Sequence, residues 1–184
     1  MDNPNDCWYD NVASDISPDE LLQQGDLVMQ CPIVNLEEDP VENEEYVYDI
    51  NDYDIIVMSQ SCDLVSGKTN LVLVCPFAKL ESLPEYDTDN KKESLRKGRN
   101  LGTHLLNRCD LEGESDFLVV DFRSTHSVPL HFIQKFVAKQ KNRKRLLTPY
   151  REHLSQAFAM YFMRVGLPSG IPSFKEKAPQ TTNR

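Results

Sequence analysis

A short segment, residues 59–63, follows an apolar strand-like run and carries side chains that can do chemistry. Its residues are Ser59, Gln60, Ser61, Cys62 and Asp63. Loops at the ends of regular elements commonly present functional groups. Cys62 would act as a nucleophile if a histidine approached it as a general base. Hydroxyl and carboxylate side chains also cap turns by hydrogen bonding to the backbone, so a binding role and a purely structural turn are the alternatives.

Four histidines are available as proton-transfer groups: His104, His126, His131 and His153. His126 lies among small hydroxyl residues in segment 124–127, shortly after an apolar run. A hydroxyl beside an imidazole can do acid–base work, although a polar turn has the same composition. No pattern around Cys62 matches a known cysteine-hydrolase signature. Cys62 and His126 are therefore candidate catalytic residues. Because no catalytic signature surrounds them, we nevertheless expect a protein that is not an enzyme.

The cysteines form no recognisable metal or disulfide pattern. There are five, an odd number, and no pair has the Cys-x-x-Cys spacing of a zinc knuckle. Cys31, Cys62 and Cys75 lie on or beside apolar segments, which is typical of thiols packed as small hydrophobes. A metal site built from these three and a histidine is the alternative. The sequence also lacks a glycine-rich phosphate loop, and we predict no metal and no cofactor.

Charge is divided unevenly along the chain. Residues 1–89 carry a net charge of −19 and residues 90–184 carry +10, which together give the −9 of the whole chain. Acidic residues concentrate in 35–54 and basic ones in 135–151. The basic members are Lys135, Lys139, Lys141, Arg143, Lys144, Arg145 and Arg151. This stretch would bind RNA phosphates, dock on an acidic protein, or form a solvated helix end and loop.

Apolar and β-branched runs predict the strands that would position these groups. We expect strands over 26–34, 53–59, 71–75, 100–106 and 117–122, with a short continuation at 127–128. Pro76 is expected to end the third strand, because proline cannot donate to a strand ladder. The polar segments 35–52 and 84–100 are expected to be loops, the first acidic with an extended stretch at 46–48 and the second mobile with one helical turn.

Helical periodicity appears in the last third of the chain. Residues 130–139 have an amphipathic pattern, and a longer helix is expected from Thr148 and Pro149 to Gly166. Its wide aromatic stripe must pack on the sheet or on another chain. We predict an α+β fold, with a small SH3-like antiparallel β-barrel over 25–129 and two C-terminal helices over 130–166.

The length of 184 residues fits one domain, expected over 16–168, between a disordered acidic tail at 1–15 and a flexible tail at 169–184. A membrane helix needs about 20 apolar residues, and the sequence has no such run. The start of the chain is acidic and polar rather than leader-like. We therefore expect a cytoplasmic protein without a membrane contact, and a dimer is compatible with the sequence.

Four short motifs follow one another along residues 25–140. They are Gly25-Asp26-Leu27-Val28, Ile55-Ile56-Val57-Met58-Ser59, Leu73-Val74-Cys75-Pro76 and Val119-Val120-Asp121-Phe122, the last leading to Leu130-His131-Phe132. Their order resembles that of the PemK/MazF-like small-barrel family, whose members are commonly endoribonucleases of toxin–antitoxin pairs. The resemblance implies a catalytic Arg before the second strand and a Thr after the proline of the third.

This chain departs from the family at both catalytic positions. It has Asp52-Tyr53-Asp54 where the Arg is expected and Phe77-Ala78 where the Thr is expected. Without that Arg, no obvious group would stabilise a pentavalent phosphate, and an acidic residue there would repel RNA. The resemblance therefore implies the fold, while the nuclease activity is not expected to carry over.

We accordingly expect a non-enzymatic protein-interaction or regulatory protein. By family context it would be an accessory component of a bacterial defence cassette, either toxin–antitoxin-like or CRISPR-linked. A protein is the expected partner, and RNA bound through residues 135–151 is the alternative. Two other functions stay open: a divergent endoribonuclease in which Arg123, His126 or Lys68 replaces the lost groups, and a Cys62-dependent enzyme.

Overall fold

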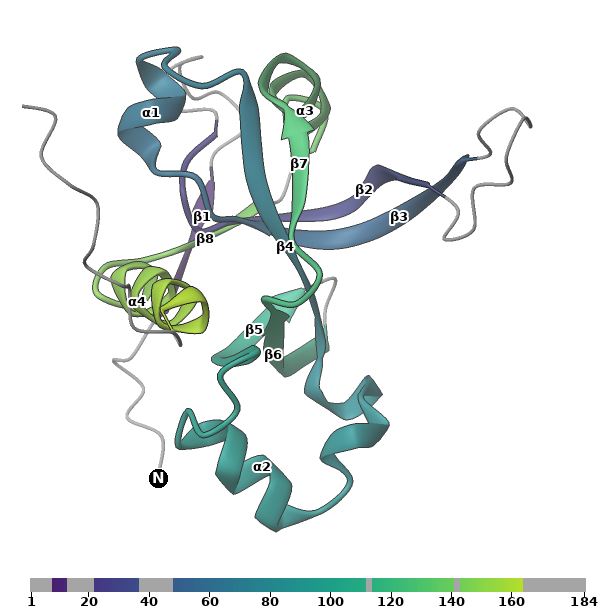
Figure 1. The fold of residues 1–184 in the computed structure, drawn as a ribbon, viewed down its shortest axis with the longest axis vertical. Coiled ribbons are helices and arrows are strands. Elements are labelled where there is room, and N and C mark those ends of the chain that lie inside the picture. Colours follow the sequence, from purple (N-terminus) through teal and green to yellow (C-terminus); the bar gives the residue numbers. More distant parts are fainter. Residues whose placement is uncertain (1–7, 13–21, 37–47, 112–113, 141–142, 164–184) are drawn as a thin grey trace, which may run out of the picture.

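A computed structural model describes residues 8–12, 22–36, 48–111, 114–140 and 143–163, and Figure 1 labels its elements. The strands are β1 (Tyr9–Val12), β2 (Asp26–Leu36), β3 (Tyr48–Val57), β4 (Leu71–Lys79), β5 (Thr103–Leu111), β6 (Glu114–Asp121), β7 (His126–Pro129) and β8 (Arg143–Leu146). The helices are α1 (Ser61–Val65), α2 (Asp89–Arg96), α3 (Leu130–Val137) and α4 (Tyr150–Phe162), with short 3-10 turns η1 (Leu80–Ser82) and η2 (Pro84–Tyr86).

The described strands form one antiparallel sheet in the order β1-β8-β2-β3-β4-β6-β5, with β7 also pairing with β4. The α+β class is therefore confirmed. The sheet is open, because its outer strands β1 and β5 do not pair with each other among the described residues. The barrel expected over 25–129 is thus not closed.

Strand β4 joins the two parts of this sheet (Figure 1). It continues past Pro76, the residue that was expected to end it. Along one edge it pairs with β7 up to Val74 and with β6 from Phe77 onward. Pro76 lies between these two ladders, opposite Ile55 of β3. A proline lacks only the N–H donor, so it is tolerated where one edge of a strand changes partner. The prediction that Pro76 ends the strand was wrong for this reason.

Two main apolar clusters cover the two faces of the sheet. Consecutive residues of β3 alternate between them, with Ile55 in one cluster and Ile56 in the other, both fully buried. Helix α3 contributes Ile133 to the first cluster, and helix α4 contributes Leu154 to the second. This burial on both faces confirms the interpretation of the β3 apolar run, because a strand covered on both sides has no polar face.

Two strands lie where the sequence predicted none. Tyr9–Val12, within the expected acidic tail, forms β1 and pairs with β8. Strand β8, Arg143–Leu146, separates the two C-terminal helices and lies within the expected helical region 130–166. Trp8 stacks on Tyr150 at the start of α4, with ring centroids 3.9 Å apart. The first described residues and the start of the last helix therefore meet at one edge of the sheet.

The remaining helical predictions are confirmed in part. Helix α3 lies within the predicted 130–139, and α4 begins directly after Thr148 and Pro149. The segment 84–100, expected to be a mobile loop, contains η2 and the two-turn helix α2, whose Leu95 is buried. Predictions for residues 1–7, 13–15, most of the acidic loop at 37–47, Lys141 and the tail at 169–184 lie outside the described residues.

Strands β2 and β3 extend beyond the rest of the sheet as a two-stranded arm, residues 31–36 and 48–53 (Figure 1). β8 pairs only with the first two residues of β2, and β4 pairs only with the last three of β3. In the described part of the chain, the arm strands therefore pair with each other alone. Part of the segment 35–52, expected to be a loop, is thus β-strand.

Candidate functional site

Cys62 lies in a shallow polar cleft of about 440 Å³ between α1 and α4. The cleft is lined by Gln24, Gln60, Ser61, Cys62, Arg151, Glu152, Ser155 and Gln156. Cys62 is exposed, whereas Cys31, Cys75 and Cys109 are buried, and burial raises the pKa of both Cys31 and Cys75 to about 11. The inward packing expected for Cys62 was therefore wrong. All four histidines are described, and none lines this cleft, so the cleft supplies no imidazole base for Cys62.

The hydroxyls around Cys62 stabilise the turn that leaves β3. Ser59 Oγ accepts a hydrogen bond from the Leu73 N–H at 2.8 Å, and Ser61 Oγ accepts one from the Gln24 N–H at 3.1 Å. The sulfur of Cys62 lies 3.8 Å from both Gln60 Oε1 and Asp63 Oδ1, which is the distance of a weak S–H···O hydrogen bond. These contacts fit the turn-capping interpretation of residues 59–63.

The guanidinium of Arg123 is held by carboxylates. Its Nε and Nη2 donate to Asp121 at 2.9 and 2.8 Å, and Nη2 lies 3.7 Å from Glu85. Partial burial acts to raise the pKa of Asp121, but the hydrogen bonds from Arg123 hold that pKa below its ordinary value. An arginine paired in this way has its charge compensated within the chain and is poorly placed to bind a phosphate.

His126 lies on β7, in a different cavity from Arg123. Its ring contacts that of Tyr53, with centroids 5.4 Å apart, and burial lowers its pKa below the ordinary value. His126 lines a groove of about 550 Å³, while Arg123 lines a smaller cavity of about 260 Å³. The two candidate catalytic residues therefore do not face a common site.

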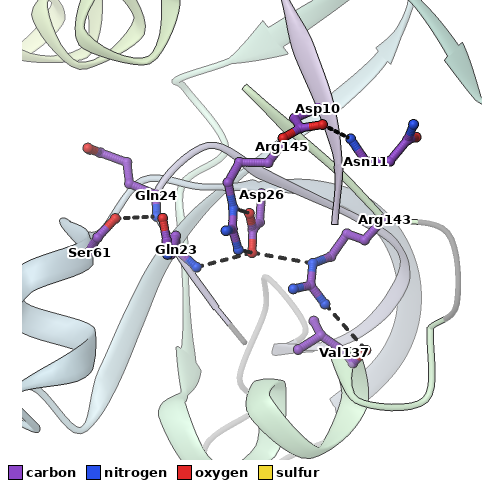
Figure 2. Close-up of polar contacts among 9 residues, drawn as sticks. All are labelled: Asp10, Asn11, Gln23, Gln24, Asp26, Ser61, Val137, Arg143 and Arg145. Atoms are coloured by element: carbon purple, nitrogen blue, oxygen red, sulfur yellow. Dashed lines mark hydrogen bonds and ion pairs between the residues drawn. The ribbon is translucent and has the colours of Figure 1, made fainter. Parts of the chain in front are cut away.

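Two of the predicted basic residues enclose a buried carboxylate (Figure 2). Asp26 is fully buried, and Arg143 is 3% exposed. Arg145 donates to Asp26 through Nε and, at 3.0 Å, through Nη2, while Arg143 Nε lies 3.3 Å from Asp26 Oδ2. The Gln23 N–H also donates to Asp26, at 3.1 Å, and Arg143 Nη1 donates to the Val137 carbonyl at 3.3 Å. Arg143 and Arg145 thus join β8 to β2.

The other predicted basic residues are dispersed. Lys135 and Lys139 are exposed on and beside α3. Lys144 Nζ donates to Asn11 Oδ1 across the β1–β8 pair at 2.8 Å. Arg151 Nη2 donates to Glu152 at 3.0 Å and to Thr148 at 3.2 Å. The described members of this stretch therefore do not form one continuous basic surface.

An uncovered apolar surface lies on the arm, where the sequence predicted an acidic loop. Four large side chains on one face of the arm form what we term the apolar arm face: Val34, Leu36, Tyr48 and Ile50, each at least 60% exposed. Val34 pairs with Ile50 and Leu36 pairs with Tyr48, so all four point to the same side of the two strands. The alternating pattern Val34-Asn35-Leu36 was the sequence signal that could have revealed this face.

The groove that contains His126 borders this surface. It lies between β2 and the β7–α3 corner and is lined by Pro32, Ile33, Val34, Thr125, His126, Ser127, Val128, Pro129 and Phe132. Val34 belongs both to the groove and to the apolar arm face, and Phe132 at the groove is 41% exposed. A concave apolar region therefore continues from the body of the protein onto the arm.

The described residues contain no group of three or more His, Cys, Asp or Glu side chains that could hold a metal ion. No described helix has the length and apolar character needed to cross a bilayer. Comparison of the chain with protein-family models, curated proteins and solved structures finds no match. The geometry of the chain itself is therefore the basis for a functional proposal.

Proposed function

We propose that the protein is a non-enzymatic interaction or regulatory component that binds a partner protein through the apolar arm face. The observation that carries this proposal is the cluster of four large apolar side chains on one face of the arm, each at least 60% exposed. Single exposed apolar residues are ordinary, but contiguous apolar patches on soluble domains commonly mark interaction sites.

The energetics of a two-stranded ribbon support the proposal. An isolated pair of strands is marginally stable in water, and independent stability requires a further strand or a surface packed on its apolar face. Among the described residues the apolar arm face has no such cover, whereas the opposite face of the arm packs Cys31 and Ile33 into the buried core. Full burial of each large apolar side chain would contribute about 1.5–3 kcal/mol. Tyr48 adds an aromatic anchor of the kind enriched at the centres of interfaces.

The candidate catalytic residues favour this proposal over the two enzymatic ones. Arg123 is paired with Asp121 and Glu85, and Arg143 and Arg145 hold Asp26. A nuclease would need at least one such cation directed at a phosphate. Cys62 is exposed in a cleft that contains no histidine. The three arginines each have a structural role within the fold.

The cellular context is part of the same proposal. The order of motifs from Gly25 to Phe132 supports kinship with PemK/MazF-like small barrels, and with it a cytoplasmic role in a bacterial defence cassette, toxin–antitoxin-like or CRISPR-linked. In that setting, a chain without the family's catalytic residues would act by binding another component.

Co-purification of arm variants from the native host tests the proposal. Val34→Asp/Ile50→Asp places two carboxylates on the apolar arm face, and Asn35→Asp/Asn51→Asp places two on the opposite face of the same strands. We expect a stoichiometric, nuclease-resistant protein partner with the wild type and the control, and its loss with Val34→Asp/Ile50→Asp. The carboxylates at 34 and 50 lie directly opposite each other and repel, so the melting temperatures of all three chains are measured in parallel to separate loss of the partner from loss of stability.

Two results would contradict the proposed function. One is a partner that is retained by Val34→Asp/Ile50→Asp at wild-type stoichiometry, because binding would then use another surface. The other is the recovery of RNA with recurrent cut ends and no protein, which would favour the divergent endoribonuclease. In that case Arg123 and His126 would be the first residues to substitute.

A further inference from the structure

The sequence segment 35–54, which includes Leu36, Tyr48 and Ile50 of the apolar arm face, is rich in acidic residues. Residues 35–54 contain nine acidic side chains and no Lys, Arg or His, as many charges as the net −9 of the whole chain. Asp49 and Asp52 are exposed on β3 of the arm itself. Asp54, nearer the body, accepts hydrogen bonds from the Gln30 N–H at 2.9 Å and from Gln30 Nε2 at 3.1 Å. The free carboxylates thus lie beside the uncovered apolar residues.

The strand register places charge directly next to the apolar face. Asp52 pairs with Pro32, two residues from the Val34–Ile50 pair, so its side chain points to the same side as the apolar arm face. Asp49 lies between Tyr48 and Ile50 and points to the other side. An apolar centre with a polar rim is the usual anatomy of a protein interface. Here the carboxylate of Asp52 lies at the edge of the apolar arm face.

We infer that the partner of the arm is a protein surface with an apolar cleft bordered by Lys and Arg side chains. This inference rests on the proposed function and specifies the chemistry of the partner. Opposite charges around an apolar anchor increase the association rate and select against wrong partners. The apolar arm face enters the cleft, and the basic border pairs with the carboxylates of the arm.

The same charges argue against the other occupants of the arm. Nucleic acid carries a dense row of phosphates, which the acidic arm repels. A symmetric dimer through the arm would place identical surfaces face to face. Each copy would then bring its own Asp52, which lies on the side of the apolar arm face, against an identically charged surface, and like charges across an interface are destabilising. A basic protein surface is the occupant that satisfies both the apolar face and the charge.

Site-specific photocrosslinking in the native host tests the inference on the full chain. A benzophenone amino acid replaces Ile50 on the apolar arm face or, as a matched control, Asn51, which is the next residue and points to the opposite side. We expect a protein adduct from position 50 and at least a tenfold lower yield from position 51. The crosslinked partner peptides should contain an apolar contact residue with Lys or Arg close by.

Charge reversal then separates the chemistry of the partner from the existence of binding. Asp49→Lys/Asp52→Lys, combined with the crosslinker at position 50, should reduce the adduct at least tenfold. Glu81→Lys/Asp110→Lys changes the net charge equally on exposed residues outside the arm and should leave the yield unchanged. In a lysate of the same host, raising salt from about 0.1 to about 0.5 M before irradiation should lower the adduct yield, because the Debye length falls well below 10 Å.

The outcomes distinguish the two levels of the proposal. An adduct yield that changes with neither the charge reversal nor salt overturns the inference that Lys and Arg border the partner's cleft, while leaving the proposed function in place. An adduct with a second copy of this chain, or with nucleic acid, also overturns the inference. Absence of any adduct from position 50 overturns the proposed function together with the inference.

Discussion

The body of the protein and its arm distribute charged and apolar groups in opposite ways. In the body, the carboxylate of Asp26 is fully buried and is enclosed by two arginines of β8. On the arm, apolar side chains such as Ile50 face water, and the exposed carboxylates of Asp49 and Asp52 lie on the same strand. The buried carboxylate of the body has its counter-charges within the chain. The exposed apolar side chains of the arm have no covering group among the described residues.

This difference separates structural from functional interpretation. A buried charge whose partners are present needs no ligand to account for it, even when its residues look like a binding site in the sequence. An apolar face without a cover does call for a second molecule. The basic stretch and the acidic stretch therefore exchange roles: the arginines of the first stabilise the fold, and the second contains the candidate interface.

The largest effect should come from removing the buried charge. Asp26→Asn leaves Arg143 buried without a counter-charge, and we expect a loss of about 3–5 kcal/mol in the free energy of unfolding. Urea denaturation measures this loss. The same substitution at the exposed Asp49 of the arm is the control and should leave the midpoint unchanged. A loss below about 1 kcal/mol at Asp26 would mean that the charges of the body are not structural, and the contrast with the arm would fail.

Strand β3 allows the body and the arm to be compared by the same substitution, Ile to Thr, at two positions. Ile55 in the body is fully buried and Ile50 on the arm is 61% exposed, both on β3. Ile55→Thr should cost about 2–4 kcal/mol, because it removes buried apolar atoms and buries a hydroxyl. Ile50→Thr keeps a β-branched side chain and should stay within about 0.5 kcal/mol of the wild type.

Thermal and urea unfolding of both variants decide this prediction. Equal costs at the two positions would show that the arm face is covered by the chain itself. The loss of partner binding in Ile50→Thr, measured with the co-purified protein, would sharpen the comparison, because it would separate a binding role from a stabilising one on the same strand.

A smaller effect should appear in the pH dependence of the free energy of unfolding, through a histidine of the body. Burial, with a further contribution from the nearby His153, lowers the pKa of His104 to about 4. In the unfolded chain a histidine has a pKa near 6.5. Between these values the unfolded chain binds a proton that the folded chain does not, so stability is complete above about pH 6.5 and falls towards pH 4.

Variants of two histidines test this dependence. The loss should reach up to about 3 kcal/mol near pH 4, as the shift in pKa implies. His104→Gln should flatten the decline in melting temperature between pH 6.5 and 4, while substitution of the exposed His131 should leave it in place. A decline of the same size in His104→Gln would assign it to other groups.

Local sequence patterns were sufficient for the elements with a clear period. The apolar run at Ile55–Val57 gave β3 and its burial on both faces, and the spacing after Pro149 gave α4. These patterns depend only on nearby residues, so they hold whatever the distant chain does. The same reasoning failed at Pro76, because the change of partner along β4 is set by strands that are far apart in sequence.

The role of the basic stretch could not be predicted from local patterns. Arg143 and Arg145 lie on the same side of a four-residue strand, and only their pairing with Asp26 explains why the charged Arg143 is buried. That pairing spans 119 residues between Asp26 and Arg145. For the candidate site, the acidic composition of 35–54 was recognised, while the apolar face that follows from the β2–β3 register was not.

The late position of β8 also has a consequence for the chain during its synthesis. β1 and β2 leave the ribosome first, but the strand that lies between them is made more than 100 residues later. At the usual speed of translation this delay lasts roughly ten seconds. Until then Asp26 cannot be buried with its arginines, and a nascent chain that stops before Arg143 cannot complete the sheet. The sheet therefore forms fully only after β8, the last described strand, has been synthesised. Products truncated before β8 would stay incompletely folded and accessible to the proteases that clear unfinished proteins.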